Sequence, residues 1–121
     1  MTIYTTAGEH TVRTREELEK ILRRSALNPY DDIWICGEEK YPCLAILVNG
    51  TRTCVHYFLN DIGDMWQSAG NWEEDVSFAV GTEPPSLMPG SCVVSLDEAI
   101  RCAGQFLDTG KRPDCIDWNE L

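Results

Sequence analysis

Residues 43–59 read CLAILVNGTRTCVHYFL, and this stretch predicts the centre of a β-sheet. Two apolar runs rich in β-branched and aromatic residues, 43–48 and 53–59, flank the segment Asn49-Gly50-Thr51-Arg52. An Asn-Gly pair between two such runs is a strong signal for a tight hairpin, because both residues tolerate the positive φ angles of a two-residue turn. We therefore expect two antiparallel strands here, with the neighbouring elements built around them.

Two capping boxes, one on each side of this hairpin, predict two helices. Thr14-Arg15-Glu16-Glu17 places a hydroxyl and a carboxylate three residues apart, so a helix should begin at Arg15 and stop near Asn28-Pro29. Ser95-Leu96-Asp97-Glu98 repeats the pattern, and apolar residues follow it at helical spacing. The second helix is expected over residues 96–108.

Further short β-type runs, separated by turn residues, extend the hairpin into a sheet. They lie at residues 33–36, 64–69, 75–80, 91–94 and 115–118. A chain of 121 residues fits one domain better than two. The expected fold class is therefore α+β: residues 1–121 form a single domain with one curved, mostly antiparallel sheet of about five to seven strands and two helices packed on one face.

Charge is unevenly distributed along the chain. Overall, 20 acidic residues oppose 10 Lys and Arg, and the formal net charge is −10. Residues 53–100 hold eight of the acidic residues and no Lys or Arg, whereas the segments before and after them each carry a net charge of −1. Nucleic-acid binding depends on Lys and Arg displacing counterions from phosphates, so we expect no direct nucleic-acid binding. A basic protein partner would instead be attracted.

Hydropathy argues against membrane binding. No apolar run approaches the roughly 18 residues of a membrane-spanning helix, and the longest candidate is the short run at residues 44–48. The first 20 residues lack the basic region and the continuous apolar region of a secretory signal. We therefore expect a cytoplasmic protein that does not bind a membrane.

The cysteines are interpreted as buried free thiols. Most lie within apolar runs, no Cys-x-x-Cys pair occurs, and none has a histidine nearby at zinc-ligand spacing. We expect neither a disulfide framework nor a bound metal or other cofactor. The six residues are Cys36, Cys43, Cys54, Cys92, Cys102 and Cys115.

Cys54 and His56 are the pair that most resembles catalytic machinery. They lie two apart on a predicted strand, so their side chains share one face. A thiol nucleophile also needs a group that orients its base and a site that stabilises an oxyanion, and no such motif is recognisable. The nucleotide-binding, metalloprotease, hydrolase and zinc-deaminase signatures are also missing from the sequence. We therefore predict that the chain is not an enzyme and has no catalytic residues.

Acidic and aromatic residues of the segment 53–100 form the candidate binding surface. Aromatic side chains anchor many interfaces, while a charged rim speeds encounter and rejects wrong partners. Trp72 is expected to be exposed, a core position is slightly favoured for Trp66, and Trp34 and Trp118 are expected in the core. If the carboxylates gather into one patch in the folded protein, we expect that patch to bind the partner. If they are scattered over several faces, they only keep the protein soluble. The candidates are Asp61, Asp64, Trp66, Trp72, Glu73, Glu74, Asp75 and Glu83.

The C-terminal third carries a longer motif. It begins with Ser95-x-x-x-Ala99 and continues as Phe106-Leu107-x-Thr109-Gly110-x-Arg112-Pro113-x-x-Ile116-x-Trp118. This pattern resembles the closing signature of a bacterial immunity-protein family that is commonly encoded beside polymorphic toxins with nucleic-acid deaminase domains. The aromatic-Pro turn in the middle of that family's pattern is present here only as Glu83-Pro84-Pro85.

The resemblance implies an antitoxin that binds and neutralises a cognate secreted bacterial toxin with a deaminase domain. A deaminase that acts on DNA or RNA needs a basic channel around its zinc pocket, and an acidic surface would occlude that channel or the active site. Two alternatives from other classes stay open. One is a small acidic adaptor or regulatory protein that binds another basic protein, and the other is an enzyme built on Cys54 and His56.

Overall fold

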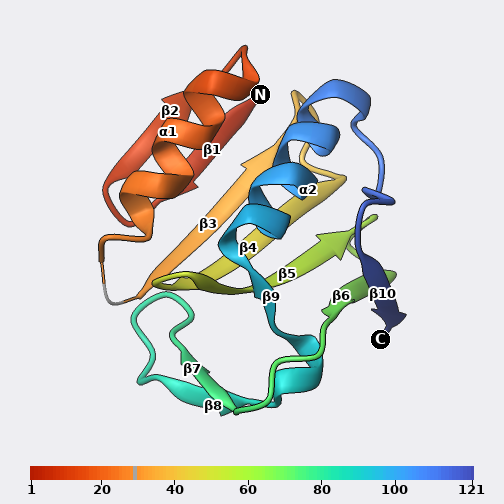
Figure 1. Ribbon diagram of the computed structural model, residues 1–121. Coiled ribbons are helices and arrows are strands. Elements are labelled where there is room, and N and C mark those ends of the chain that lie inside the picture. Colours follow the sequence, from red (N-terminus) through yellow and green to blue (C-terminus); the bar gives the residue numbers. More distant parts are fainter. Residues whose placement is uncertain (29) are drawn as a thin grey trace.

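The computed structural model describes residues 1–28 and 30–121, and Figure 1 shows the arrangement of its helices and strands. No helix in these residues is long and apolar enough to cross a membrane. In chain order the elements are β1 (Thr2–Thr5), β2 (Gly8–Thr11), α1 (Arg15–Ser25), β3 (Asp31–Cys36), β4 (Cys43–Asn49), β5 (Arg52–Phe58), β6 (Met65–Ala69), β7 (Val76–Phe78), β8 (Ser86–Met88), the 3-10 turn η1 (Gly90–Cys92), β9 (Val94–Ser95), α2 (Leu96–Thr109) and β10 (Asp117–Glu120).

Within the described residues, seven strands form one antiparallel sheet in the order β10-β6-β5-β4-β3-β1-β2. The short β9 pairs with β5 beside this path, and β7 and β8 form a separate two-stranded ribbon. The predicted central hairpin is confirmed, because β4 pairs with β5 from Cys43 opposite Phe58 to Asn49 opposite Arg52. Its two-residue turn is Gly50-Thr51 rather than Asn49-Gly50, and of these residues only Gly50 has a positive φ, of 63°.

Both helices pack on the same face of the sheet, as the sequence predicts (Figure 1). Leu18 and Leu22 of α1 join one buried cluster with Phe106 of α2 and the sheet residues that point toward them. The Phe106 ring meets the Tyr57 ring of β5 edge to face, with 6.2 Å between the ring centroids. Each large apolar side chain buried in this way contributes about 1.5–3 kcal/mol. This cluster therefore holds both helices on the sheet, and the α+β fold class is confirmed.

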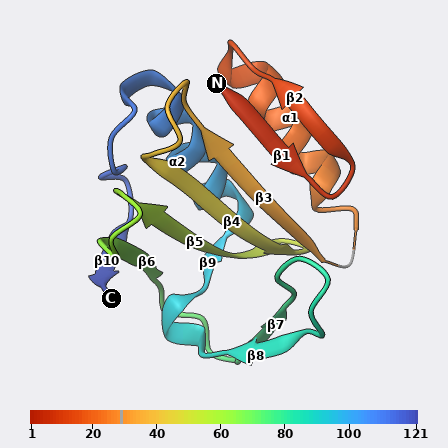
Figure 2. The same ribbon diagram turned by 180° about the vertical axis from the view of Figure 1, so that it is seen from behind.

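The opposite face of the sheet is covered at one end only. The β7-β8 ribbon lies across that end, at the bottom of Figure 2, and Phe78 of β7 is buried there in a second cluster with Leu47 and Cys54. Further along the same face, Trp34 and Phe58 are only half-buried. Among the described residues, Figure 2 shows no helix or strand other than the ribbon on this face of the sheet. The prediction of a core position for Trp34 is therefore wrong, because its strand has helices on one face and solvent on the other.

The N-terminal hairpin β1-β2 is not predicted by the sequence. Its strands have four residues each, and β2 is exposed throughout, so neither strand shows the long apolar alternation of the central pair. Its place in the sheet comes from long-range pairing with β3, where Ile3 lies opposite Ile35. Both of these isoleucines are fully buried.

Several predicted boundaries also move. The run at 91–94 forms the turn η1 and only the start of β9, because Cys92 and Val93 donate their backbone N–H groups to carbonyls three residues back. The last strand lies at 117–120 rather than 115–118, and the ribbon strand β8 is not predicted. Helix α1 ends at Ser25, before the predicted stop near Asn28-Pro29, of which Pro29 lies outside the described residues.

Ser95 forms the predicted capping box of α2 and allows a stability prediction. Its Oγ accepts the Glu98 backbone N–H at 3.1 Å, and the Glu98 carboxylate accepts the Ser95 backbone N–H at 3.2 Å. We expect Ser95→Ala to lower the free energy of unfolding by about 1 kcal/mol, measured by urea denaturation. Ser91→Ala, at an exposed serine just before the helix, is the matched control and should leave stability unchanged. Equal stabilities of the two variants would show that the box does not stabilise α2.

Candidate functional site

The loop that carries Trp72 follows β6 and is held against η1 by backbone hydrogen bonds. The Gly70 N–H donates to the Ser91 carbonyl at 2.8 Å, and the Trp72 N–H donates to the Gly90 carbonyl at 3.1 Å. Two glycines make this close approach possible. A Cβ on Gly70 would overlap the Val93 carbonyl, and one on Gly90 would overlap the Trp72 carbonyl. The loop is therefore anchored by main-chain contacts rather than by its own side chains.

Trp72 stands between two adjoining hollows of about 420 and 470 Å³. Trp72 is 37% exposed, which confirms the expectation of an exposed residue. Five carboxylates line these hollows, and no Lys, Arg or His does so among the residues that the structure describes. We call this surface the Trp72 groove, and its defining residues are Trp72, Glu73, Glu74, Glu98, Asp114 and Asp117.

Different elements supply the carboxylates of the Trp72 groove. Glu98 belongs to the first turn of α2 and also completes the capping box. Asp114 is fixed from two directions, because its Oδ1 accepts from the Gln105 side chain at 2.6 Å and its backbone N–H donates back to that side chain at 3.3 Å. Asp117 is placed by strand pairing, since it lies opposite Ala69 at the end of β6. A partner that enters the groove would thus meet preorganised negative charge.

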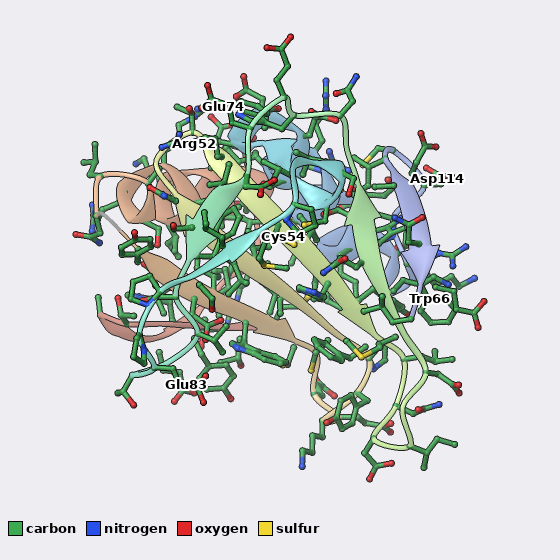
Figure 3. All side chains as sticks on the ribbon, turned by 90° about the horizontal axis from the view of Figure 1, so that it is seen from below. Arg52, Cys54, Trp66, Glu74, Glu83 and Asp114 are labelled. Carbon is green, nitrogen blue, oxygen red and sulfur yellow. The ribbon has the colours of Figure 1, made fainter. Side chains whose placement is uncertain are left out.

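The predicted contact residues do not gather in one place. Trp72, Glu73 and Glu74 line the groove, and Asp75 is the next exposed residue of the same loop. Glu83 lies in the connection between β7 and β8, on the opposite side of the molecule from Glu74 in Figure 3.

Asp61 and Asp64 lie in the β5-β6 loop, before β6 begins, whereas the Trp72 loop follows its end. The acidic stretch 53–100 is therefore divided among several loops. Part of it combines with Asp114 and Asp117, which lie beyond that stretch. Sequence reasoning missed these two and Glu98 as members of the site. Asp117 reaches the groove through the pairing of β10 with β6, and sequence patterns do not specify which strands pair.

Trp66 points to the helix face of the sheet. Its ring is half-buried against the main core cluster and lies tilted beside Tyr57, with 5.8 Å between the centroids. The Arg112 guanidinium sits over the Trp66 ring at 4.9 Å from its centroid. A cation in this position is attracted to the ring face and shields it. Trp66 therefore acts mainly in packing, although part of it remains accessible at the rim of the fold.

Cys54 and His56 share a face of β5 but have different surroundings. The Cys54 thiol is buried under the β7-β8 ribbon, and burial raises its pKa. His56 instead bonds Gln67, with 3.0 Å between His56 Nε2 and Gln67 Nε2, and burial lowers the pKa of His56. The thiol thus stays protonated and the imidazole stays neutral near pH 7. Cys54 and His56 are therefore arranged as packed side chains and not as a catalytic nucleophile with its base.

All six cysteines are free, and they lie in neighbouring pairs. Cys36 lies opposite Cys43 in the pairing of β3 with β4, and the Sγ atoms of Cys102 and Cys115 are 3.4 Å apart. Burial is less complete than the sequence predicts, since Cys36 is half-buried and Cys115 is exposed. Within the part of the chain that the structure describes, no group of three His, Cys, Asp or Glu residues is placed to hold a metal ion.

These features define a small α+β binding protein with an acidic groove. The family model of the immunity protein Imm1 matches residues 6–120, which is nearly the whole chain. The chain therefore belongs to the Imm1 family of immunity proteins. This confirms the resemblance found in the C-terminal motif, and the family points to a non-enzymatic inhibitor.

A curated relative supports the same family. The double-stranded DNA deaminase immunity protein of Burkholderia cenocepacia (strain H111) is 31% identical to this chain over 112 residues. The similarity covers 86% of this chain and 85% of the relative. The relationship therefore extends over most of both chains.

Cysteine exposure yields a prediction about thiol reactivity. Burial raises the pKa of the Cys43, Cys54 and Cys102 thiols, to about 12 for Cys43, so these groups should resist alkylation in the folded protein. Cys115 is exposed and should react first with a maleimide, as followed by peptide mass spectrometry. Cys115→Ser should remove the fast phase. Labelling of Cys54 as fast as that of Cys115 would contradict the buried environment of Cys54.

The close contacts of Gly90 yield a prediction about the Trp72 groove. Gly90→Ala places a methyl group against the Trp72 carbonyl, so the loop must shift, and we expect a loss of about 1–3 kcal/mol in stability. The Trp72 amide should also exchange its hydrogen faster, measured by nuclear magnetic resonance. Gly37→Ala is the control, because nothing lies within 4 Å of the position that its methyl group would take. Unchanged exchange at Trp72 would show that Gly90 does not hold this loop.

Proposed function

We propose that this chain neutralises a nucleic-acid deaminase toxin in the cytoplasm by binding it and occluding its substrate channel. The relative from Burkholderia cenocepacia is an immunity protein for a double-stranded DNA deaminase, and this supports the choice of toxin class. The observation that carries the mode of action is the Trp72 groove, with five carboxylates around a partly exposed indole.

The chemistry of the toxin explains why such a groove would inhibit it. A deaminase that acts on nucleic acid must guide a negatively charged backbone to its zinc pocket, so the channel carries Lys and Arg. Carboxylates held by the loop, by α2 and by β10 present negative charge to such a channel, and a carboxylate is not a substrate. Inhibition then needs only a stable complex and no reaction.

Trp72 supplies the apolar part of this contact. An aromatic side chain that becomes fully buried on binding contributes strongly to affinity, and the carboxylates around it exclude wrong partners. Asp75 extends the negative charge along the same loop. Partial exposure of Trp72 in the free protein therefore matches an anchor that is completed by its partner.

The other candidate residues take different roles in the proposal. Asp61, Asp64 and Glu83 are exposed and lie outside the Trp72 groove, so they do not occlude the channel and instead add to the negative field that attracts a basic partner. Trp66 lies beneath Arg112 and would meet the toxin only if that side chain moved away.

A double charge reversal in the groove tests the proposal. We expect Glu73→Lys with Glu74→Lys to weaken binding to the deaminase domain of the cognate toxin by at least tenfold at low salt, because like charges would meet at the channel. The salt dependence of the dissociation constant should also become shallower. The measurement is titration calorimetry across a salt series, together with survival of cells that produce the toxin.

The matched control moves the same charge change away from the groove. Glu16 and Glu17 are adjacent and exposed in the first turn of α1, and the variant with both changed to Lys should bind nearly as well as the wild type. Equal weakening by both double variants would show that the groove contributes only through the net charge of the protein and not as a specific contact. Wild-type protein that binds no toxin and protects no cell would favour the adaptor alternative.

A further inference from the structure

A second surface lies on the face of the sheet opposite the helices. Trp34 of β3 and Phe58 of β5 stack across β4, with ring centroids 5.1 Å apart and an interplanar angle of 18°. The stack is possible because β4 presents the small Ala45 directly opposite Trp34. His56 extends the row, with its ring centroid 6.1 Å from that of Phe58. The rings bury Ala45 but remain half-exposed themselves.

A hollow of about 570 Å³ opens beside this stack. Tyr4, Trp34 and Tyr41 form its aromatic walls, and the Tyr4 side chain is 44% exposed. We call Tyr4, Trp34, Tyr41, His56 and Phe58 the aromatic face. A contiguous group of partly exposed aromatic rings is uncommon on a free protein surface and is typical of the centre of an interface.

Acidic loops border the aromatic face. The β3-β4 loop and the β5-β6 loop leave the same end of the sheet, because Phe58 lies opposite both Cys43 and Met65 (Figure 3). Their exposed carboxylates are Glu38, Glu39, Asp61 and Asp64. The basic residue of these loops is Lys40, whose Nζ lies 5.7 Å from the centroid of the Tyr41 ring.

We propose that the aromatic face is a second contact surface for the toxin and binds an apolar side chain of the toxin flanked by Lys or Arg. This inference rests on the proposed function. The acidic border selects a basic partner over a second copy of this chain, since a symmetric contact between two copies would bring the four carboxylates of each together. The rings of the aromatic face then supply the apolar area that contributes most of the binding free energy at this contact.

The position of the aromatic face assigns it a role different from that of the Trp72 groove. The two surfaces lie at opposite ends of β6, one near Met65 and the other beyond Ala69. A toxin segment on the aromatic face is therefore separate from the segment that enters the groove. The aromatic face adds affinity from outside the catalytic channel, whereas the groove blocks the channel itself.

Single substitutions on the aromatic face test this division. The probe is the deaminase domain of the cognate toxin, used with its active site disabled for binding and intact for inhibition. We expect Tyr4→Ala and Trp34→Ala each to raise the dissociation constant at least tenfold, while inhibition at saturating protein stays complete. Glu38→Lys with Glu39→Lys should weaken binding too, and most strongly at low salt.

Exposed apolar residues elsewhere provide the matched controls. Leu27 is 85% exposed and Leu87 is 68% exposed, and their change to alanine should leave binding unaltered. Tyr4→Ala removes an exposed side chain and should leave the fold intact. Its effect on binding therefore tests the aromatic face even if Trp34→Ala lowers the melting temperature. Wild-type affinity for Tyr4→Ala and for the Glu38/Glu39 variant would overturn the inference, as would self-association of the chain that Tyr4→Ala abolishes. Wild-type protein that binds the toxin without inhibiting it would instead refute the proposed function.

Discussion

The antiparallel register between β4 and β5 determines which side chains face the helices and which face the solvent. Because side chains alternate along a strand, a shift of one residue would exchange the two faces of the whole sheet. In the observed register, with Asn49 opposite Arg52, Leu44 and Ile46 enter the helix-facing core. Ala45 then lies on the other face, where its small size lets the rings of Trp34 and Phe58 meet above it.

The same sheet positions the Trp72 groove through its edge strands. Pairing of β10 with β6 brings Asp117 to Ala69, and the close contact of Gly70 and Gly90 with neighbouring carbonyls brings the Trp72 loop to the same place. The groove therefore depends on backbone contacts between segments far apart in sequence. One of its carboxylates, that of Glu98, also stabilises the fold through the capping box of α2.

Local sequence signals predicted the central elements because those elements depend on local chemistry. The capping box at Ser95, the Thr14 side-chain cap of α1 and the hairpin turn at Gly50 each operate within a few residues, and all three appear in the structure. The box predicted at Thr14 forms only in part, because the Glu17 carboxylate accepts the Thr14 hydroxyl and not the Thr14 backbone N–H. The hairpin β1-β2 and the position of Trp34 were beyond such reasoning. Both depend on which distant element pairs with a strand or covers its face, and alternation along one strand does not encode that choice.

The candidate site was predicted in part for a related reason. Clustering of acidic residues along the chain identified Glu73 and Glu74 correctly as neighbours of Trp72, because they are adjacent in sequence. It also grouped Asp61 and Glu83 with them, which the fold separates, and it omitted Asp114, which the fold adds. Ionic screening limits direct attraction to about 8 Å at physiological salt. In the proposed complex, carboxylates beyond that range from the toxin would influence how often the partners meet, whereas those beside Trp72 or the aromatic face would influence how long they stay together.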